Sequence, residues 1–155
     1  MKYFPSCSSK TTPTTSVSSY RTVTSVPRAP QTTSPMLTDT IAVIANTIDY
    51  SLNSQLLNSL SKSQYIILSS SEKWDYYLKR NNIILLGGHR APGGVGDIVS
   101  ELLTSEDKQR LLSSPTSNLI LEKKNRWNPD KKIIIIAGYE KEQTGLALRE
   151  YFTQK

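Results

Sequence analysis

The sequence predicts an α/β fold: a three-layer sandwich around a mostly parallel, flavodoxin- or Rossmann-like sheet of about five strands. Short apolar runs recur along residues 38–155, and most are separated by segments with apolar residues at helical spacing. Strands that alternate with helices usually pair in parallel through crossover connections. Residues 124–131 form a connection too short for a parallel crossover, which leaves room for one antiparallel edge strand.

Five apolar runs are the expected strands, at residues 40–46, 65–68, 83–86, 118–121 and 133–136. Charged residues follow the fourth run, as is typical of an edge strand, because charge discourages further pairing. The fifth run consists of four isoleucines, which predicts a strand in the interior of the sheet.

Helices are expected between these runs, each with an apolar stripe that would pack on the sheet. The stripe of the first helix is Leu52, Leu56, Leu57 and Leu60, and a short second helix spans residues 74–78 with a serine cap near residue 70. The stripe of the third helix is Val95, Ile98, Val99, Leu102 and Leu103, and the fourth helix is capped by Thr104 and docked by Leu111 and Leu112. The stripe of the last helix is Thr144, Ala147, Leu148, Tyr151 and Phe152.

The glycine-rich stretch between the third strand and its helix is the strongest candidate for a binding site. In open α/β sheets, ligands bind beyond the carboxyl ends of the strands, where this loop would lie. Loop amides, the following helix N-terminus and a cationic side chain could together hold a phosphate. The candidate ligand-binding residues are Gly87, Gly88, His89, Arg90, Gly93 and Gly94.

Neither of the common phosphate-binding glycine motifs is present in this loop. It lacks the Gly-x-x-x-x-Gly-Lys-Ser/Thr pattern and the Gly-x-Gly-x-x-Gly spacing. The alternative is that glycine and proline only turn the chain, with at least one glycine at positive φ.

Carboxylates follow three of the expected strands, at Asp49, Asp97 and Glu140. Two of them at one sheet edge could bind a cation, although Asp97 is equally suited to the first turn of its helix. His89 is the only histidine and Cys7 the only cysteine, so no zinc centre is expected. We predict no catalytic constellation, no metal site and no cofactor.

Residues 1–37 predict a disordered Ser/Thr/Pro-rich tail or tether, and residues 38–155 a single α/β domain. The tail carries a net charge of +4 and the domain +2, so a nucleic-acid partner is not expected. The sequence contains no signal peptide and no apolar run of membrane-spanning length. Cys7 directly precedes the Ser/Thr-rich tract, which is the position of the acylated cysteine in a surface lipoprotein, so Cys7 is a candidate lipid anchor. The alternative is that Cys7 is an unmodified thiol and the protein is cytoplasmic.

Three stretches resemble a set of archaeal S-layer-related cell-surface proteins of unknown function: Leu86–Val99 with its Gly-Gly-x-x-Ala-Pro loop, Arg126–Pro129 with its Trp-Asn-Pro turn, and Ile133–Thr144 with its Ala-Gly strand end and threonine-bearing helix start. The resemblance covers about residues 39–153. It implies a Rossmann-like module in the envelope, usually without an assigned active site. His89 and Arg90 stand where we would expect an acidic or neutral pair.

Two functions are therefore expected. The first is a non-catalytic cell-envelope module on a flexible tether, with a structural or interaction role and other envelope proteins as partners; its only membrane contact would be a lipid on Cys7. The second is a cytoplasmic protein that binds a nucleotide or another phosphate compound through residues 87–96.

Overall fold

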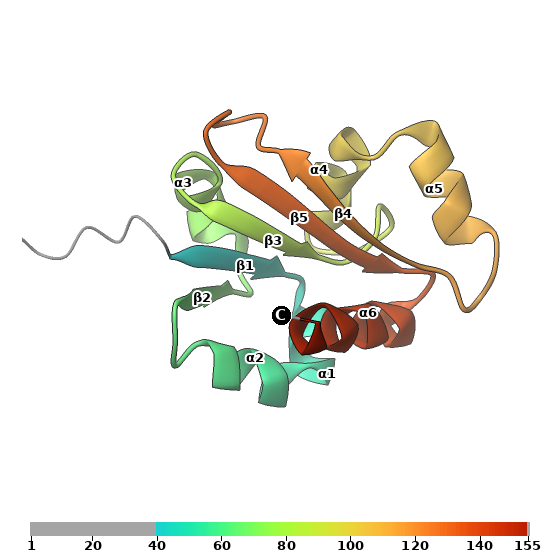
Figure 1. Ribbon diagram of the computed structural model, residues 1–155, viewed down its shortest axis with the longest axis horizontal. Helices are drawn as coiled ribbons and strands as arrows, with labels where there is room; N and C mark the ends of the chain where they lie inside the picture. Colours follow the sequence, from blue (N-terminus) through green and yellow to red (C-terminus); the bar gives the residue numbers. More distant parts are fainter. Residues whose placement is uncertain (1–39, 155) are drawn as a thin grey trace, which may run out of the picture. The chain divides into compact units, whose positions relative to one another are not determined.

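The computed structural model describes residues 40–154 and confirms the predicted α/β class (Figure 1). The expected tail and Cys7 lie outside the described residues. The elements are β1 (Ile41–Ala45), α1 (Thr47–Leu52), α2 (Ser54–Leu60), β2 (Tyr65–Leu68), the 3-10 turn η1 (Ser71–Lys73), α3 (Trp74–Leu78), β3 (Asn82–Leu86), α4 (Val95–Leu102), α5 (Ser105–Leu112), β4 (Asn118–Lys124), β5 (Lys132–Gly138) and α6 (Lys141–Thr153).

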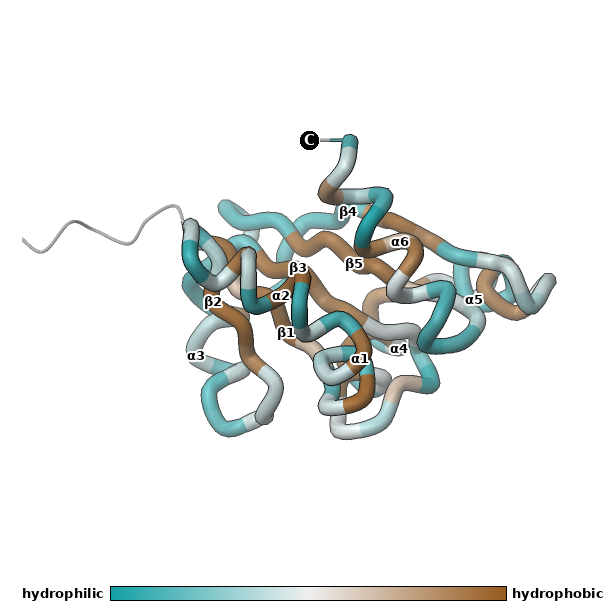
Figure 2. Tube along the Cα trace, turned by 90° about the horizontal axis from the view of Figure 1, so that it is seen from below, coloured by the Kyte–Doolittle hydropathy of each residue, from teal (hydrophilic) through white to brown (hydrophobic). Residues whose placement is uncertain are grey.

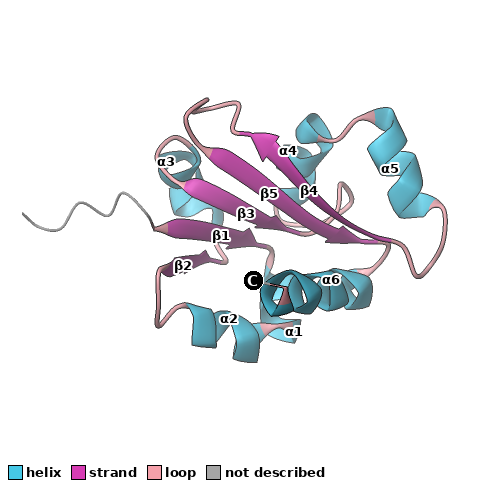
Figure 3. Ribbon diagram, viewed as in Figure 1, coloured by secondary structure: helices cyan, strands magenta, loops and turns pink. Residues whose placement is uncertain are grey.

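The five strands form one sheet in the order β2-β1-β3-β5-β4 (Figure 3). β1 pairs in parallel with both β2 and β3, and β3 pairs in parallel with β5. β4 runs antiparallel to β5 at the edge, which confirms the short hairpin expected around residues 124–131. From β1 the chain first builds β2 on one side and then β3 on the other, so β1 and β3 flank a topological switch point.

Alternate residues of each strand point to opposite faces of the sheet and enter two separate cores. Ile83 and Leu85 of β3 face α3, α4 and α5, whereas Ile84 and Leu86 face α2 and α6. α1 lies beside α6 on this second side (Figure 1). Hydrophobic residues accordingly concentrate along β1, β3 and β5 (Figure 2). The result is the predicted three-layer sandwich.

The structure corrects three local expectations. The first helix is broken at Asn53, whose side-chain amide donates to the Asp49 carbonyl oxygen at 2.9 Å, so Leu52 leaves the apolar stripe and is 51% exposed. Ser70 is the N-cap residue of η1, which precedes α3, but its side chain makes no cap hydrogen bond. Leu111 is buried, but Leu112 is 36% exposed because α5 docks mainly through one residue.

Other local expectations are confirmed. Thr104 caps α5 through a reciprocal capping box with Asp107. The stripe of α6 is buried at Thr144, Ala147 and Leu148. Trp127, which the sequence places beside the hairpin turn, packs against the core. Hence the local signals held for the α5 cap and the α6 stripe and failed at Leu52, Ser70 and Leu112.

Candidate functional site

A pocket of about 400 Å³ lies at the carboxyl edge of the sheet, where the connections after β1, β3 and β5 meet. Its position is the crevice in which open α/β sheets bind ligands. It is lined by Asn46, Ile48, Asp49, Gly88, His89, Arg90, Ala91, Pro92, Leu111, Leu112, Gly138, Tyr139, Glu140, Lys141 and Thr144. The predicted loop is therefore one wall of a larger site.

The loop of residues 87–94 contributes to this wall through a tight turn. The Ala91 amide donates to the Gly88 carbonyl oxygen at 2.9 Å, which leaves His89 and Arg90 as the central residues of the turn. Gly88, His89 and Arg90 line the pocket, as the sequence predicted for ligand-binding residues. Their position matches the expectation; ligand binding itself stays a prediction.

The other three predicted glycines shape the loop and do not line the pocket. Gly87, Gly93 and Gly94 have φ values of +133°, +70° and +86°, a backbone conformation that favours glycine. A Cβ at Gly87 would also lie 2.9 Å from the Ala91 Cβ and 3.2 Å from Asp49 Oδ2. Gly87 thus lets the chain turn close to the end of β1.

The opposite wall is built at the start of α6. Thr144 Oγ1 accepts from the Gly138 amide at 3.0 Å and donates to the Glu140 carbonyl oxygen at 3.1 Å, which holds the helix against the end of β5. Glu140 is the N-cap but makes no side-chain cap bond, so the first amides of this 13-residue helix have no such partner. Lys141, the first helical residue, lines the pocket together with Arg90.

Asp49 is the most buried charged group at the site, with 5% of the residue exposed. Asn46 caps α1: its Oδ1 accepts from the amides of Ile48 and Asp49, both at 2.9 Å, and its Nδ2 donates to Asp49 Oδ2. Burial raises the pKa of Asp49, the Asn46 hydrogen bond opposes that effect, and the charge of Glu142 adds to it. The other oxygen, Oδ1, has no hydrogen-bond partner among the described residues.

His89 is the second titratable group with a buried, unpartnered atom. Its Nδ1 has no hydrogen-bond partner in the described part of the chain. Burial lowers the pKa of His89, and the positive charges of Arg90 and Lys108 lower it further. These effects favour the neutral imidazole, which can accept a hydrogen bond at one nitrogen.

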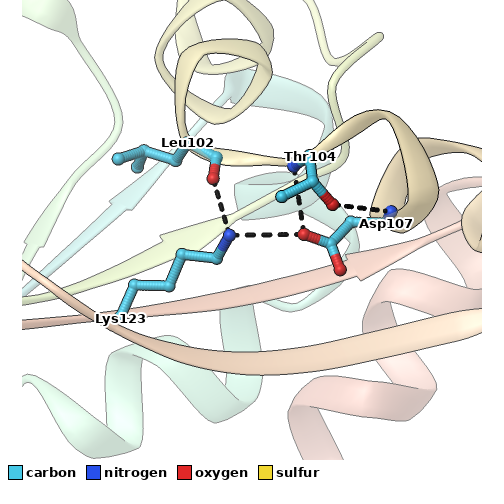
Figure 4. A network of polar contacts seen from close by, with 4 residues as sticks. All are labelled: Leu102, Thr104, Asp107 and Lys123. Carbon is cyan, nitrogen blue, oxygen red and sulfur yellow. Dashed lines mark hydrogen bonds and ion pairs between the residues drawn. The ribbon is translucent and has the colours of Figure 1, made fainter.

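A network of polar contacts holds α5 beside the pocket (Figure 4). Lys123 Nζ on β4 donates to the Leu102 carbonyl oxygen at 2.7 Å and to Asp107 Oδ2 at 3.2 Å. Asp107 also accepts from the Thr104 amide at 3.0 Å. The network fixes the start of α5, whose last residues, Leu111 and Leu112, supply apolar lining.

The expected carboxylate cluster is only partly assembled. Asp49 and Glu140 both line the pocket, whereas Asp97 is exposed in the first turn of α4 and does not. Within residues 40–154, no group of three or more His, Cys, Asp or Glu side chains could hold a metal ion. Sequence reasoning missed Asn46, Tyr139, Lys141 and Thr144 as pocket residues, although Asn46 ends the first predicted strand and the other three follow the fifth.

No family model matches this chain, and no curated protein or solved structure is significantly similar to it. Among the residues that the structure describes, no helix is both long enough and apolar enough to cross a membrane. The class of protein rests on the fold alone: an α/β sandwich of Rossmann or flavodoxin type with a pocket at its switch point.

Proposed function

We propose that the α/β domain binds a small ligand carrying a phosphate or carboxylate group in the pocket at the carboxyl edge of its sheet. One observation carries the proposal: Arg90 and Lys141, from two different connections, line one pocket at the N-terminus of α6. Its volume of about 400 Å³ falls within the range of small-molecule sites.

Arg90, Lys141 and the start of α6 favour an anion at this end of the pocket, whereas the carboxylates of Glu140, which lines the pocket, and Glu142, in the first turn of α6, oppose it. The first amides of a helix and its dipole attract negative charge. Arg90 is exposed and forms no ion pair within residues 40–154, so its guanidinium is available for bidentate contact with an anion. Lys141 Nζ lies 3.9 Å from Glu142 Oε1, but both side chains are more than half exposed. This ion pair is therefore weak and competes little with a bound anion for Lys141.

A thermal-shift screen of nucleotides, sugar phosphates and sugar acids tests the proposal. Binding to the folded state stabilises it by about 2.7 kcal/mol when the ligand is at a hundred times its Kd. We expect Arg90→Ala to weaken binding about tenfold or more, because a charge-assisted hydrogen bond contributes roughly 1.5–3 kcal/mol.

Arg80→Ala is the matched control, since Arg80 lies at the other end of β3 and stacks on Tyr76. It should bind as the native protein does. The proposal fails if no compound raises the melting temperature, or if Arg90→Ala binds every hit with unchanged affinity.

A second candidate function, a cell-envelope module on a tether, concerns location and is compatible with ligand binding. It is supported by the three S-layer-like stretches and by the Ser/Thr/Pro composition of residues 1–37. Two of those stretches, Leu86–Val99 and Ile133–Thr144, contribute most of the pocket lining. Fractionation of native cells tests it: recovery with the envelope supports the module, and recovery wholly in the soluble cytoplasm counts against it.

A further inference from the structure

Two buried polar atoms in the pocket are not used by the anion site. Asp49 Oδ1 and His89 Nδ1 have no hydrogen-bond partner among the described residues, and both residues line the pocket. Arg90, Lys141 and the start of α6 would hold the anionic group without either atom. Two hydrogen-bonding atoms therefore remain without a protein partner on residues of the pocket lining.

The structural role of Asp49 does not account for its free oxygen. Of the two carboxylate oxygens, only Oδ2 accepts a hydrogen bond from the Asn46 side chain. The Asp49 amide donates to Asn46 Oδ1, and the Asp49 carbonyl oxygen accepts from the Asn53 side chain. A buried acceptor without a partner costs about 1–3 kcal/mol. Because Asp49 is only 5% exposed, bulk water satisfies the oxygen poorly, and a hydroxyl donor held in the pocket would offset that cost.

We propose that Asp49 accepts a hydrogen bond from a ligand hydroxyl group, with His89 as a second polar contact, so that the ligand is an anionic polyol such as a sugar phosphate or a sugar acid. This inference rests on the proposed function. A hydroxyl donates to a carboxylate without bringing charge.

Other occupants fit the Asp49 side of the pocket less well. A second anionic group would be repelled by Asp49 and by the neighbouring charge of Glu142. A divalent cation requires six or more oxygen ligands, and the described residues hold no cluster of three candidate ligands. A purely alkyl chain would exclude water from Asp49 without replacing the lost hydrogen bonds.

The inference predicts selectivity that can be measured on the full chain by titration calorimetry. The probes are glucose 6-phosphate and gluconate as anionic polyols, butyl phosphate and butyrate as anions without hydroxyls, and glucose as a polyol without the anion. We expect each anionic polyol to bind at least tenfold more tightly than the anion of its own class. The phosphate and carboxylate pairs also distinguish the two kinds of anion.

The variant Asp49→Asn places an amide donor where the free oxygen stood and keeps an acceptor for Asn46. It should reduce the preference for the polyol to less than threefold while the affinity for the alkyl anion stays within threefold. Asp97→Asn is the matched control, an exposed acid that is also in the first turn of a helix, and it should keep the full preference.

Each outcome separates the two proposals. Equal binding of polyol and alkyl anions by the native protein, which needs no variant, overturns the inference about Asp49 and leaves the anion site standing. A preference that survives in Asp49→Asn also overturns it. Binding of glucose without either anion, abolished in Asp49→Asn, supports the inference and overturns the anion site. If no probe binds, the inference about Asp49 fails, and the wider thermal-shift screen decides the anion site.

Discussion

Asp49 stabilises the start of α1 and also lines the pocket. It is the third residue of α1, where a carboxylate interacts well with the helix dipole, and it pairs with the N-cap Asn46. Burial at the end of β1 opposes that benefit because it removes the carboxylate from water, and the pKa of Asp49 is raised as a result. Residues that weaken a fold while facing a pocket are expected at binding sites.

The raised pKa of Asp49 predicts a pH-dependent difference between the native protein and Asp49→Asn. Above the ordinary pKa of 3.8, the unfolded carboxyl loses its proton while the folded one retains it, so the folded state binds more protons. Stability from this group is therefore full at low pH and is lost as the pH rises through the folded pKa. We expect the melting temperature of Asp49→Asn, relative to the native protein, to increase from about pH 4 to pH 8.

The pKa of Asp107 is shifted in the opposite direction to that of Asp49, and its effect on stability is the same in the native protein and in Asp49→Asn. The hydrogen bond from the Thr104 amide, aided by Lys123, lowers the pKa of Asp107. Its contribution is present above the ordinary pKa and is lost as the pH falls, equally in both proteins. A melting-temperature difference that stays flat across the pH range would show that Asp49 is not perturbed by burial.

At the scale of single elements, α5 is the wall of the pocket that depends most on specific polar contacts. Only Leu111 of this helix is buried, and the rest of its sequence is largely charged or polar. The Thr104 cap and the Lys123 contacts hold its first turn against the α4 terminus and β4 (Figure 4). The part of the pocket lining at Leu111 and Leu112 therefore depends on a network at the far end of the helix.

Removing the cap tests how much of α5 it supports. Thr104→Ala deletes the hydroxyl that accepts from the Asp107 amide at 3.1 Å, and loss of an N-cap costs about 1 kcal/mol. Chemical denaturation of the variant should show that decrease in the free energy of unfolding. Thr153→Ala, which removes a hydroxyl near the end of α6, should change stability by less than about 0.5 kcal/mol. Equal effects of the two variants would contradict the capping assignment.

For the whole domain, the two ends of the sheet have different roles. The carboxyl edge carries the pocket, whereas the amino edge is tied by the β4–β5 hairpin. Asn125, 1% exposed, donates to the Leu78 carbonyl oxygen at 2.6 Å and accepts from the Trp127 amide at 2.8 Å. It joins the hairpin to the end of α3, which is 47 positions away in sequence. Residues 126–129 thus belong to the structural hairpin and lie away from the pocket.

Asn125→Ala should destabilise the domain by about 2–3 kcal/mol, because it leaves buried backbone groups without partners. Asn128 offers a control in the same hairpin: its side chain donates to the Lys79 carbonyl oxygen at 3.0 Å, but the bond is exposed. Asn128→Ala should cost less than about 1 kcal/mol. Denaturant titrations compare the two, and a loss at Asn128 as large as that at Asn125 would refute the assignment of the buried tie.

The sequence by itself determined the α/β class and the Thr104 cap, allowed one antiparallel edge strand, and required positive φ at one or more of the loop glycines, which the structure places at Gly87, Gly93 and Gly94. Each depends on residues that are neighbours along the chain, where periodicity and turn chemistry act directly. It could also place Asp49 and Glu140 beyond strand ends, because parallel strands finish at one edge.

Only the tertiary structure decided which of those residues face one pocket. The strand order β2-β1-β3-β5-β4 brings together connections that are distant in the chain, at Asn46, Gly88 and Gly138, and no local signal specifies that order. The burial of Asp49 and the exposure of Asp97 likewise depend on the packing around them, although both stand in the first turn of a helix. Periodicity places a residue on its own element, whereas the neighbours of that element determine whether its charge is solvated or buried beside the pocket.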